Sequence, residues 1–195
     1  MEIQAQRRLE LINATLESVA LHGLQNSTIV TISKLAGMSS GIISHYFGGK
    51  QGLIEATIRH LLEQLKQALL EGTRGQNLSA TERLFKIVEA NFTQLQRTAS
   101  VYQTWLCFWA RAMHDPALAR LQHINSARLY SNLRYSFAQM LPKEQATIAA
   151  KQTAAMIDGF WLRSALSAQP TEEFSQAEHL CKCFIENLLQ QYGDK

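Results

Sequence analysis

Apolar residues recur every three or four positions along most of the chain, and short polar or glycine-containing breaks separate these stretches. That spacing places the apolar side chains on one face of an α-helix. The first such stretch covers residues 9–20, and Gly23 follows where a C-terminal cap belongs. The β-branched residues do not form the alternating runs that indicate strands. The pattern therefore predicts an all-α protein.

Three further helices are expected in the N-terminal region. Polar capping residues at 26–28 precede a short second helix, and Gly37 ends it. Ser39 and Ser40 are expected to cap a short third helix that runs to Phe47. A glycine pair ends that helix, and a longer fourth helix begins at Lys50 and reaches about residue 70. The first three helices would form a small head.

The rest of the chain predicts a larger helical body. After a linker at residues 72–76, the apolar periodicity continues in five separate stretches. These lie at about 80–97, 101–113, 116–140, 143–167 and 172–191. Proline stands near the start of three of them, where a helix tolerates it. We expect about nine helices in total.

The corner between the second and third helices has the spacing of a helix-turn-helix. This motif joins two short helices through a turn of three or four residues that often contains glycine, and residues 37–39 supply that turn. Gly37 can adopt a positive φ, and Met38 can fill the angle between the helices. Ile43 and Phe47 would pack inward. On spacing alone, a plain helical hairpin with a glycine corner is an alternative.

The outer side of the third helix carries small side chains that let its backbone approach a DNA groove. The residues expected at base edges are Ser40, Gly41, Ser44 and His45. Those expected at phosphates are Thr28, Tyr46 and Lys50, the last helped by the positive end of the fourth helix. Ser39, in the turn, completes the set of candidate DNA-binding residues.

The segment from Thr28 to Lys50 resembles the DNA-binding motif of the TetR family of repressors. The matching residues are Thr28, Ile32, Ala36-Gly37, Ser39-Ser40-Gly41, His45-Tyr46-Phe47 and Lys50. The family often has an aromatic residue where this chain has Ser44, so we expect a shorter or different DNA contact there. The resemblance implies a transcriptional repressor that binds a double-stranded DNA operator.

Further segments resemble the BetI branch of that family. They are Gly41–Phe47, Trp105–Trp109, His114-Asp115-Pro116 and Ile157–Arg163. Repressors of this branch control the synthesis of the osmoprotectant glycine betaine from choline, and so belong to the response to osmotic stress. The resemblance implies a homodimer, a palindromic operator near the betaine genes, and choline as the inducer.

Aromatic residues in the body suggest a pocket for a small cation. One stretch has two tryptophans a helical turn apart, a phenylalanine between them and a tyrosine one turn earlier. A second stretch has an aspartate and a tryptophan three positions apart. Aromatic faces with one carboxylate suit a trimethylammonium group. The candidate ligand-binding residues are Tyr102, Trp105, Phe108 and Trp109 in the first stretch and Asp158 and Trp161 in the second.

Alternatives stay open for this pocket. An aromatic stripe at helical spacing is more often core packing. Asp158 could pair with Arg111 or Arg163 instead of a ligand, because an unpaired buried carboxylate is costly. A TetR-type repressor that responds to another cationic or hydrophobic ligand is a second reading of the function. Phe92 and Tyr135 are weaker pocket candidates.

The last two predicted helices carry more apolar surface than the body needs for its own core. Paired across a two-fold axis they would form a four-helix bundle; the alternative is that they only cover the monomer core. We therefore assign residues 1–50 to a helix-turn-helix DNA-binding domain. Residues 51–195 would form a ligand-binding and dimerisation domain, and the helix at about 50–70 would link the two.

Composition, net charge and cysteine content limit the class of protein and the kinds of site that the chain could contain. Hydrophobic residues make up 46% and charged residues 18%, which is typical of a globular chain. The net charge of +3 is compatible with DNA binding but does not indicate it. Three cysteines without a CxxC pair argue against a disulfide framework or a zinc site.

Other functional classes lack support in the sequence. We find no catalytic motif, so an enzyme or small-molecule carrier with a similar helical N-terminal domain is the less favoured alternative. We expect no metal and no cofactor other than the effector. The polar N-terminus has no signal-peptide core, and no apolar stretch is long enough to span a membrane. The sequence therefore predicts a cytoplasmic protein with no membrane partner.

Overall fold

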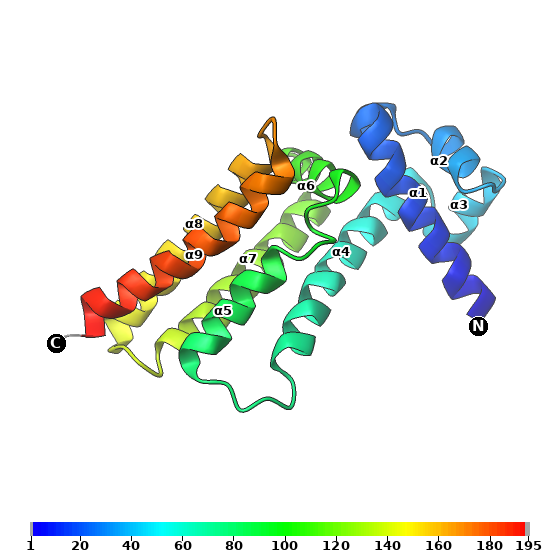
Figure 1. The fold of residues 1–195 in the computed structure, drawn as a ribbon. Helices are drawn as coiled ribbons and strands as arrows, with labels where there is room; N and C mark the ends of the chain where they lie inside the picture. Colours follow the sequence, from blue (N-terminus) through cyan, green and yellow to red (C-terminus); the bar gives the residue numbers. More distant parts are fainter. Residues whose placement is uncertain (1, 194–195) are drawn as a thin grey trace. The chain divides into compact units, whose positions relative to one another are not determined.

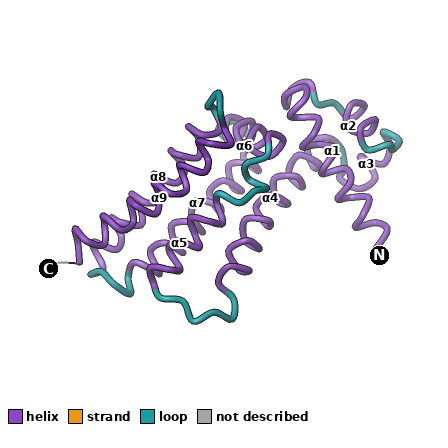
Figure 2. The backbone as a smooth tube through the Cα atoms, in the orientation of Figure 1, coloured by secondary structure: helices purple, strands orange, loops and turns teal. Residues whose placement is uncertain are grey.

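The computed structural model describes residues 2–193, which form helices joined by short turns (Figure 1). Within these residues there are nine helices and no strand (Figure 2). The helices are α1 (Glu2–Asn26), α2 (Ile29–Leu35), α3 (Gly41–Phe47), α4 (Lys50–Thr73), α5 (Ala80–Asn91), α6 (Ala99–Ala112), α7 (Pro116–Phe137), α8 (Lys143–Ala165) and α9 (Pro170–Gly193). The prediction of an all-α chain with about nine helices is confirmed.

Glycines separate the short helices of the N-terminal region, as the sequence predicted. Gly37 follows α2 with a φ of 65°, and Gly48 follows α3 with a φ of 72°. Side chains with a Cβ rarely adopt this left-handed conformation, so the two positions favour glycine. The amide of Gly48 donates to the carbonyl of Ser44 at 3.0 Å, which closes the last turn of α3.

One helix is shorter than predicted, because α5 ends at Asn91 and not at residue 97. Residues 92–98 form a turn that side chains stabilise. Asn91 Nδ2 donates to the carbonyl of Ile87 at 2.8 Å, and Arg97 Nε donates to the carbonyl of Phe92 at 2.6 Å. Such side-chain bonds to the backbone compete with helix propagation. Arg97 also bonds Glu178 of α9, so the turn depends on a distant contact.

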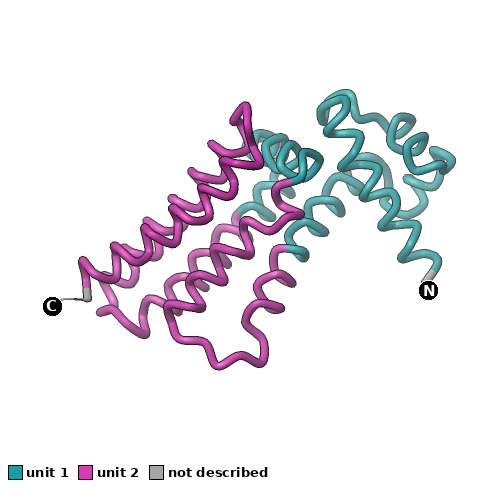
Figure 3. The backbone as a smooth tube through the Cα atoms, viewed as in Figure 1, with its two compact units in different colours: residues 1–64, 98–122 teal, residues 65–97, 123–195 magenta. Residues whose placement is uncertain are grey.

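The chain divides into two compact units (Figure 3). Unit 1 comprises residues up to 64 together with residues 98–122, and unit 2 comprises residues 65–97 and those from 123 onward. Helix α6 packs with α1 inside unit 1. These packing units differ from the functional division predicted at residue 50, which stays a prediction about function.

The core of the helix-turn-helix region consists of apolar residues from α1 to α4. Its buried members are Leu11, Ile12, Ala14, Ile32, Ile43 and Leu53. Met38 and Phe47 are partly buried and pack against this cluster, in the positions that the spacing predicted. Full burial of one such aliphatic side chain contributes about 1.5–3 kcal/mol. The short helices α2 and α3 therefore gain their stability from this shared core.

Unit 2 contains α8 and α9, which pack along their length (Figure 1). Ala149 and Ala150 of α8 are fully buried, so the backbones of neighbouring helices can approach closely. Several large apolar side chains of the same two helices stay exposed. They are Ile148, Leu162 and Leu180, and Leu166 at the C-cap of α8 is exposed as well. None of the helices described is both long enough and apolar enough to cross a membrane.

Candidate DNA-binding surface and effector residues

Thr28, a predicted phosphate contact, is the N-cap of α2 and is exposed. Its Oγ1 accepts a hydrogen bond from the amide of Thr31 at 3.1 Å, and Thr31 Oγ1 accepts one from the amide of Thr28 at 2.8 Å. This reciprocal capping box satisfies two amides that a helix N-terminus otherwise leaves without partners. The sequence analysis missed Thr31, because threonine stands where the usual pattern has glutamate or glutamine.

Buried hydroxyl groups tie the end of α1 to the start of α2. Ser18 Oγ donates to Ser27 Oγ at 3.0 Å, and Ser27 Oγ donates to the carbonyl of Gly23 at 2.8 Å. Both serines are buried, and burial of a hydroxyl group without a hydrogen-bond partner would destabilise the fold. The pair fixes the backbone immediately before Thr28.

Helix α3 divides into a buried side and an exposed side. Ile43 is fully buried, while Phe47 is partly buried against the core of the helix-turn-helix region. Five of the predicted DNA-binding residues lie on α3 or just before it and are exposed, namely Ser39, Ser40, Gly41, Ser44 and His45. The structure thus presents small polar groups and one imidazole on the accessible side of a short helix.

Ser40 occupies the N-cap of α3, but its side chain does not cap the helix. Its hydroxyl lies 3.0 Å from that of Ser33, and Ser33 Oγ donates to the carbonyl of Val30 at 3.1 Å. Ser33 has only one hydroxyl proton, so Ser40 is the donor of the pair. The expectation that the serine side chains cap this helix is therefore wrong for Ser40, which braces α3 against α2.

The predicted phosphate contacts Tyr46 and Lys50 are partly buried. The ring of Tyr46 lies 4.9 Å from that of His45, measured between centroids. Lys50 Nζ donates to the carbonyls of Leu24 and Gln25 at 3.4 and 3.5 Å. Burial, and secondarily the charge of Arg111, lowers the pKa of Lys50. In this conformation the Lys50 ammonium group binds the end of α1. To contact a phosphate, the Lys50 side chain must leave these two carbonyls and turn toward the DNA.

Gly52, in the first turn of α4, is a residue that the sequence analysis missed. A Cβ at this position would lie 1.9 Å from the carbonyl oxygen of Phe47. The backbones of α3 and α4 therefore approach so closely that only glycine fits. The available signal was a glycine inside a helical stretch, where this residue is intrinsically unfavourable.

A polar cluster joins the start of α4 to the end of α6 and was also missed. Gln51 Nε2 donates to Asp115 Oδ2 at 2.6 Å, and Arg111 Nη2 donates to Gln51 Oε1 at 2.8 Å. Arg111 Nε lies 3.8 Å from Asp115 Oδ2. Asp115 Oδ1 also accepts from the amide of Leu118 at 3.2 Å and so caps α7. All of these residues belong to unit 1.

Four of the predicted effector residues lie on α6 in unit 1. Trp105 and Phe108 are buried, and their ring centroids are 5.6 Å apart in an edge-to-face arrangement. Trp109 is partly buried, with its ring 6.5 Å from that of Trp105. Tyr102 is partly buried one turn earlier. Phe108 also lines a small apolar hollow with Thr104. The structure therefore brings these aromatic residues together on one helix.

The other two predicted effector residues lie on α8 in unit 2. Trp161 is buried, and its ring packs edge-to-face on Phe174 at 5.6 Å. Asp158 is accessible to solvent, yet burial raises the pKa of its carboxyl to about 6. Surrounding protein can desolvate a group whose own surface remains accessible.

The weaker pocket candidates have structural roles in unit 2. Phe92 is buried, with its ring 6.4 Å from that of Phe174. Tyr135 is exposed, and the guanidinium carbon of Arg83 lies 5.3 Å from its ring centroid. Among the residues that the structure describes, no group of three or more histidine, cysteine, aspartate or glutamate side chains is arranged to hold a metal ion.

Two family models match the chain. The model of bacterial regulatory proteins of the TetR family covers residues 11–57, which include α2 and α3. The model of the C-terminal domain of BetI-type transcriptional repressors covers residues 80–190, more than half of the chain.

Similar proteins agree with these matches. The HTH-type transcriptional regulator BetI of Burkholderia lata is 48% identical over 85% of this chain and 86% of that protein. The regulator BetI 2 of Chromohalobacter salexigens is 43% identical over 96% of this chain and 90% of that protein. These relatives are transcriptional regulators and not enzymes.

Solved structures share the fold. One, described as a transcriptional regulator of Pseudomonas aeruginosa PAO1, has a TM-score of 0.81 and 26% identity over 95% of this chain and 91% of that one. Another, from Saccharomonospora viridis and in complex with choline, has a TM-score of 0.81 and 18% identity over 93% of this chain and 96% of that one. With the matched helix-turn-helix and the matched body, the chain belongs to the TetR family as a transcriptional repressor with a BetI-type C-terminal domain.

Proposed function

We propose that this repressor binds a palindromic operator as a homodimer and that choline weakens this binding, so that the genes for glycine betaine synthesis are expressed when choline is present. The observation that carries the proposal is the exposed face of α3, where small polar side chains lie above a fully buried Ile43. A short helix with this division can enter a major groove and place hydroxyl and imidazole groups at base edges.

The exposed apolar side chains of α8 and α9 support the homodimer. Ile148, Leu162, Leu166 and Leu180 are each at least 38% exposed, although they lie on, or directly after, helices whose other faces form a core. A second copy of the same two helices would cover them in a four-helix bundle. Such a dimer presents two α3 helices to half-sites about 34–36 Å apart on the operator.

The aromatic residues and Asp158 support a cationic effector. Trp105 and Trp109 offer π-faces on α6 of unit 1, where Phe108 and Tyr102 lie on the same helix. Each face stabilises a quaternary ammonium group by about 0.5–2 kcal/mol. The choline bound to the structurally similar Saccharomonospora viridis regulator is a further, fold-level support.

In unit 2, Asp158 carries the negative charge that suits a cation. Its carboxyl carries the desolvation cost that raises its pKa to about 6. Choline keeps its positive charge at every pH, so binding would offset this cost and favour the ionised form. The affinity for choline should therefore rise as the pH increases through about 6.

The test is fluorescence anisotropy of the purified protein on its own promoter DNA, with and without millimolar choline. The controls are glycine betaine, which is a zwitterion, and a neutral alcohol in which carbon replaces the ammonium nitrogen. We expect salt-dependent DNA binding that choline weakens and both controls leave unchanged. The expected loss of DNA affinity is about 5- to 150-fold, the usual size of an allosteric coupling.

Variants identify the site in the same assay. Asp158→Asn should abolish the response to choline while DNA binding without choline persists, because Asp158 belongs to unit 2 and the α3 surface belongs to unit 1. The matched control is Glu144→Gln, which changes another exposed carboxyl of α8 that is not among the candidate ligand-binding residues. DNA binding that ignores choline but responds to another hydrophobic cation would replace choline with that ligand class. Absence of specific DNA binding would overturn the operator proposal.

A further inference from the structure

Arg8 of α1 makes two contacts with the C-terminal end of α3, which lies 38 positions further along the chain. Its Nη1 donates a hydrogen bond to the backbone carbonyl of Tyr46. Its guanidinium carbon also lies 4.4 Å from the centroid of the Phe47 ring, in cation–π geometry. One exposed side chain thus holds both the backbone and the last side chain of the helix proposed to enter the groove.

The end of α3 needs such a contact for a physical reason. The last carbonyls of any helix lack partners within the helix, and α3 has only seven residues. A helix this short has little stability of its own, so tertiary contacts set its position. A cation at the C-terminus also interacts favourably with the helix dipole. Arg8 supplies a donor, a positive charge and a planar surface at that point.

A second contact holds the same end of α3 from α4. The carbonyl oxygen of Phe47 abuts Gly52 so closely that no Cβ fits between them. Gly52 limits how far α3 can move toward α4, and Arg8 binds the preceding carbonyl from α1. The C-terminal end of α3 is therefore held by side-chain chemistry at Arg8 and by backbone contact at Gly52, in addition to the core around Ile43.

We propose that Arg8 is a positioning residue for DNA recognition, which sets the orientation of α3 and does not itself contact DNA. The inference rests on the proposed role of α3 as the helix that reads the operator. The planar guanidinium makes the hydrogen bond and the ring contact together, whereas a lysine ammonium is a point charge on a flexible chain. Lysine at this position keeps the charge and loses the fixed geometry.

A positioning role and a phosphate contact predict different results. If Arg8 orients α3, its loss weakens binding to operator DNA more than binding to random DNA, and the dependence on salt is unchanged. If Arg8 binds a phosphate, both affinities fall together, and the slope of log K against log salt decreases by about 0.9. The charge-retaining Arg8→Lys variant sharpens this difference, because it preserves electrostatic attraction.

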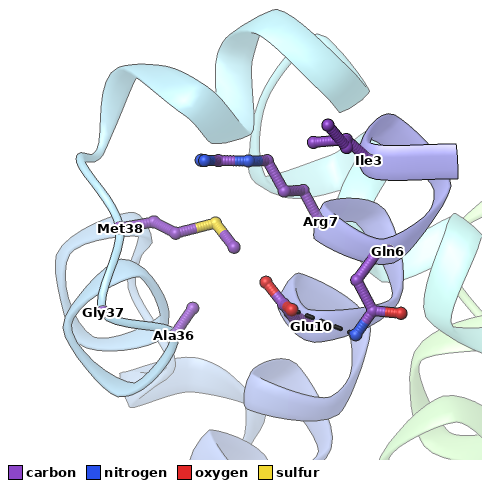
Figure 4. A pocket seen from close by; sticks show the side chains of 7 residues that line it. All are labelled: Ile3, Gln6, Arg7, Glu10, Ala36, Gly37 and Met38. Atoms are coloured by element: carbon purple, nitrogen blue, oxygen red, sulfur yellow. Dashed lines mark hydrogen bonds between the residues drawn. The ribbon is translucent and has the colours of Figure 1, made fainter. Parts of the chain in front are cut away.

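Arg7 provides a matched control for loss of one positive charge. It is adjacent to Arg8, but its side chain lines a surface hollow of about 570 Å³ together with Glu10 and Met38 (Figure 4). In that view Arg7 points into the hollow and toward the turn between α2 and α3. Arg7→Gln removes the same charge as Arg8→Gln without removing the contact at the end of α3.

The experiment compares the full-length protein with Arg8→Lys, Arg8→Gln and Arg7→Gln. Binding to promoter DNA and to random DNA of equal length is measured between about 50 and 200 mM salt, the range over which phosphate contacts are resolved. We expect both Arg8 variants to lower the ratio of specific to random affinity about tenfold, the effect of one charge-assisted hydrogen bond. Arg7→Gln should leave that ratio unchanged. Equal losses on both DNAs with a smaller salt slope, or an unchanged ratio, would overturn the proposal.

Amide hydrogen exchange gives a readout that does not depend on DNA. We expect residues 44–48 to exchange faster in Arg8→Gln than in the wild type, with no such change in Arg7→Gln. Should the wild-type protein fail to bind its promoter, the operator proposal fails, while exchange still tests whether Arg8 holds α3. Unchanged exchange in Arg8→Gln would show that it does not hold the helix.

Discussion

Replacement of Gly52 by alanine tests the close contact between α3 and α4. In most exposed helical positions, Gly→Ala stabilises a protein by up to about 1 kcal/mol, because alanine has the higher helix propensity. Here the new Cβ would lie 1.9 Å from the carbonyl oxygen of Phe47, whereas real Cβ contacts essentially never fall below 3.0 Å. The two backbones must therefore separate by about 1 Å.

The size of the effect follows from these opposing contributions. Overpacking commonly costs about 1–3 kcal/mol, and a backbone-to-backbone collision belongs at the upper end because no side chain can rotate away. After subtraction of the gain in helix propensity, we expect a net loss of about 2 kcal/mol. For a chain of this size, that corresponds to a decrease in Tm of about 4–8 °C.

The assay is thermal and urea unfolding followed by circular dichroism, with Gly41→Ala as the matched control. A Cβ at Gly41 meets nothing within 4 Å, so that variant should be at least as stable as the wild type. Because Gly41 is exposed at the start of α3, its added methyl group should weaken operator binding instead. A Gly52→Ala protein as stable as the wild type would refute the argument from backbone contact.

Two further predictions concern a helix cap and a carboxyl group. Thr28→Ala should lower the free energy of unfolding by about 1 kcal/mol because it removes the N-cap of α2. Thr28→Ser keeps the hydroxyl and should lower the free energy of unfolding by less. Equal losses of stability in urea unfolding of the two variants would contradict the capping role. The pKa of Asp158 is about 6 in the folded protein, above its ordinary value of 3.8. The stabilisation from holding that proton is therefore present below about pH 4 and is lost as the pH rises through about 6. Urea unfolding across this range should show a fall in stability that Asp158→Asn lacks, and an identical pH dependence in both proteins would contradict the shift.

The candidate ligand-binding residues are divided between the two units. Tyr102, Trp105, Phe108 and Trp109 share one helix, so their proximity follows from spacing alone. Trp161 packs against Phe174 in unit 2, which is the core role that the sequence analysis kept as an alternative. The sequence identified the residue types that suit a cation. Spacing along one helix cannot specify which of them turn toward a ligand.

Local signals determined much of the fold. Gly37 and Gly48 ended the short helices because a positive φ favours glycine whatever surrounds it. The apolar period placed Ile43 inside, because a helix repeats every 3.6 residues independently of its neighbours. The motif around α3 was therefore evident in the sequence, and the matches to the TetR and BetI-type models agree with it.

Long-range contacts determined the structural features that the sequence did not predict. A turn at 92–98 replaced the last residues of the helix predicted at 80–97 because Arg97 binds the carbonyl of Phe92 and also Glu178 of α9. Arg8 and Gly52 became important only when folding brought them to the end of α3. Neither residue stands out along the chain, since an exposed arginine and a helical glycine occur in many sequences. Periodicity and turn chemistry act between near neighbours, whereas these contacts depend on where distant segments meet, which only the tertiary structure specifies.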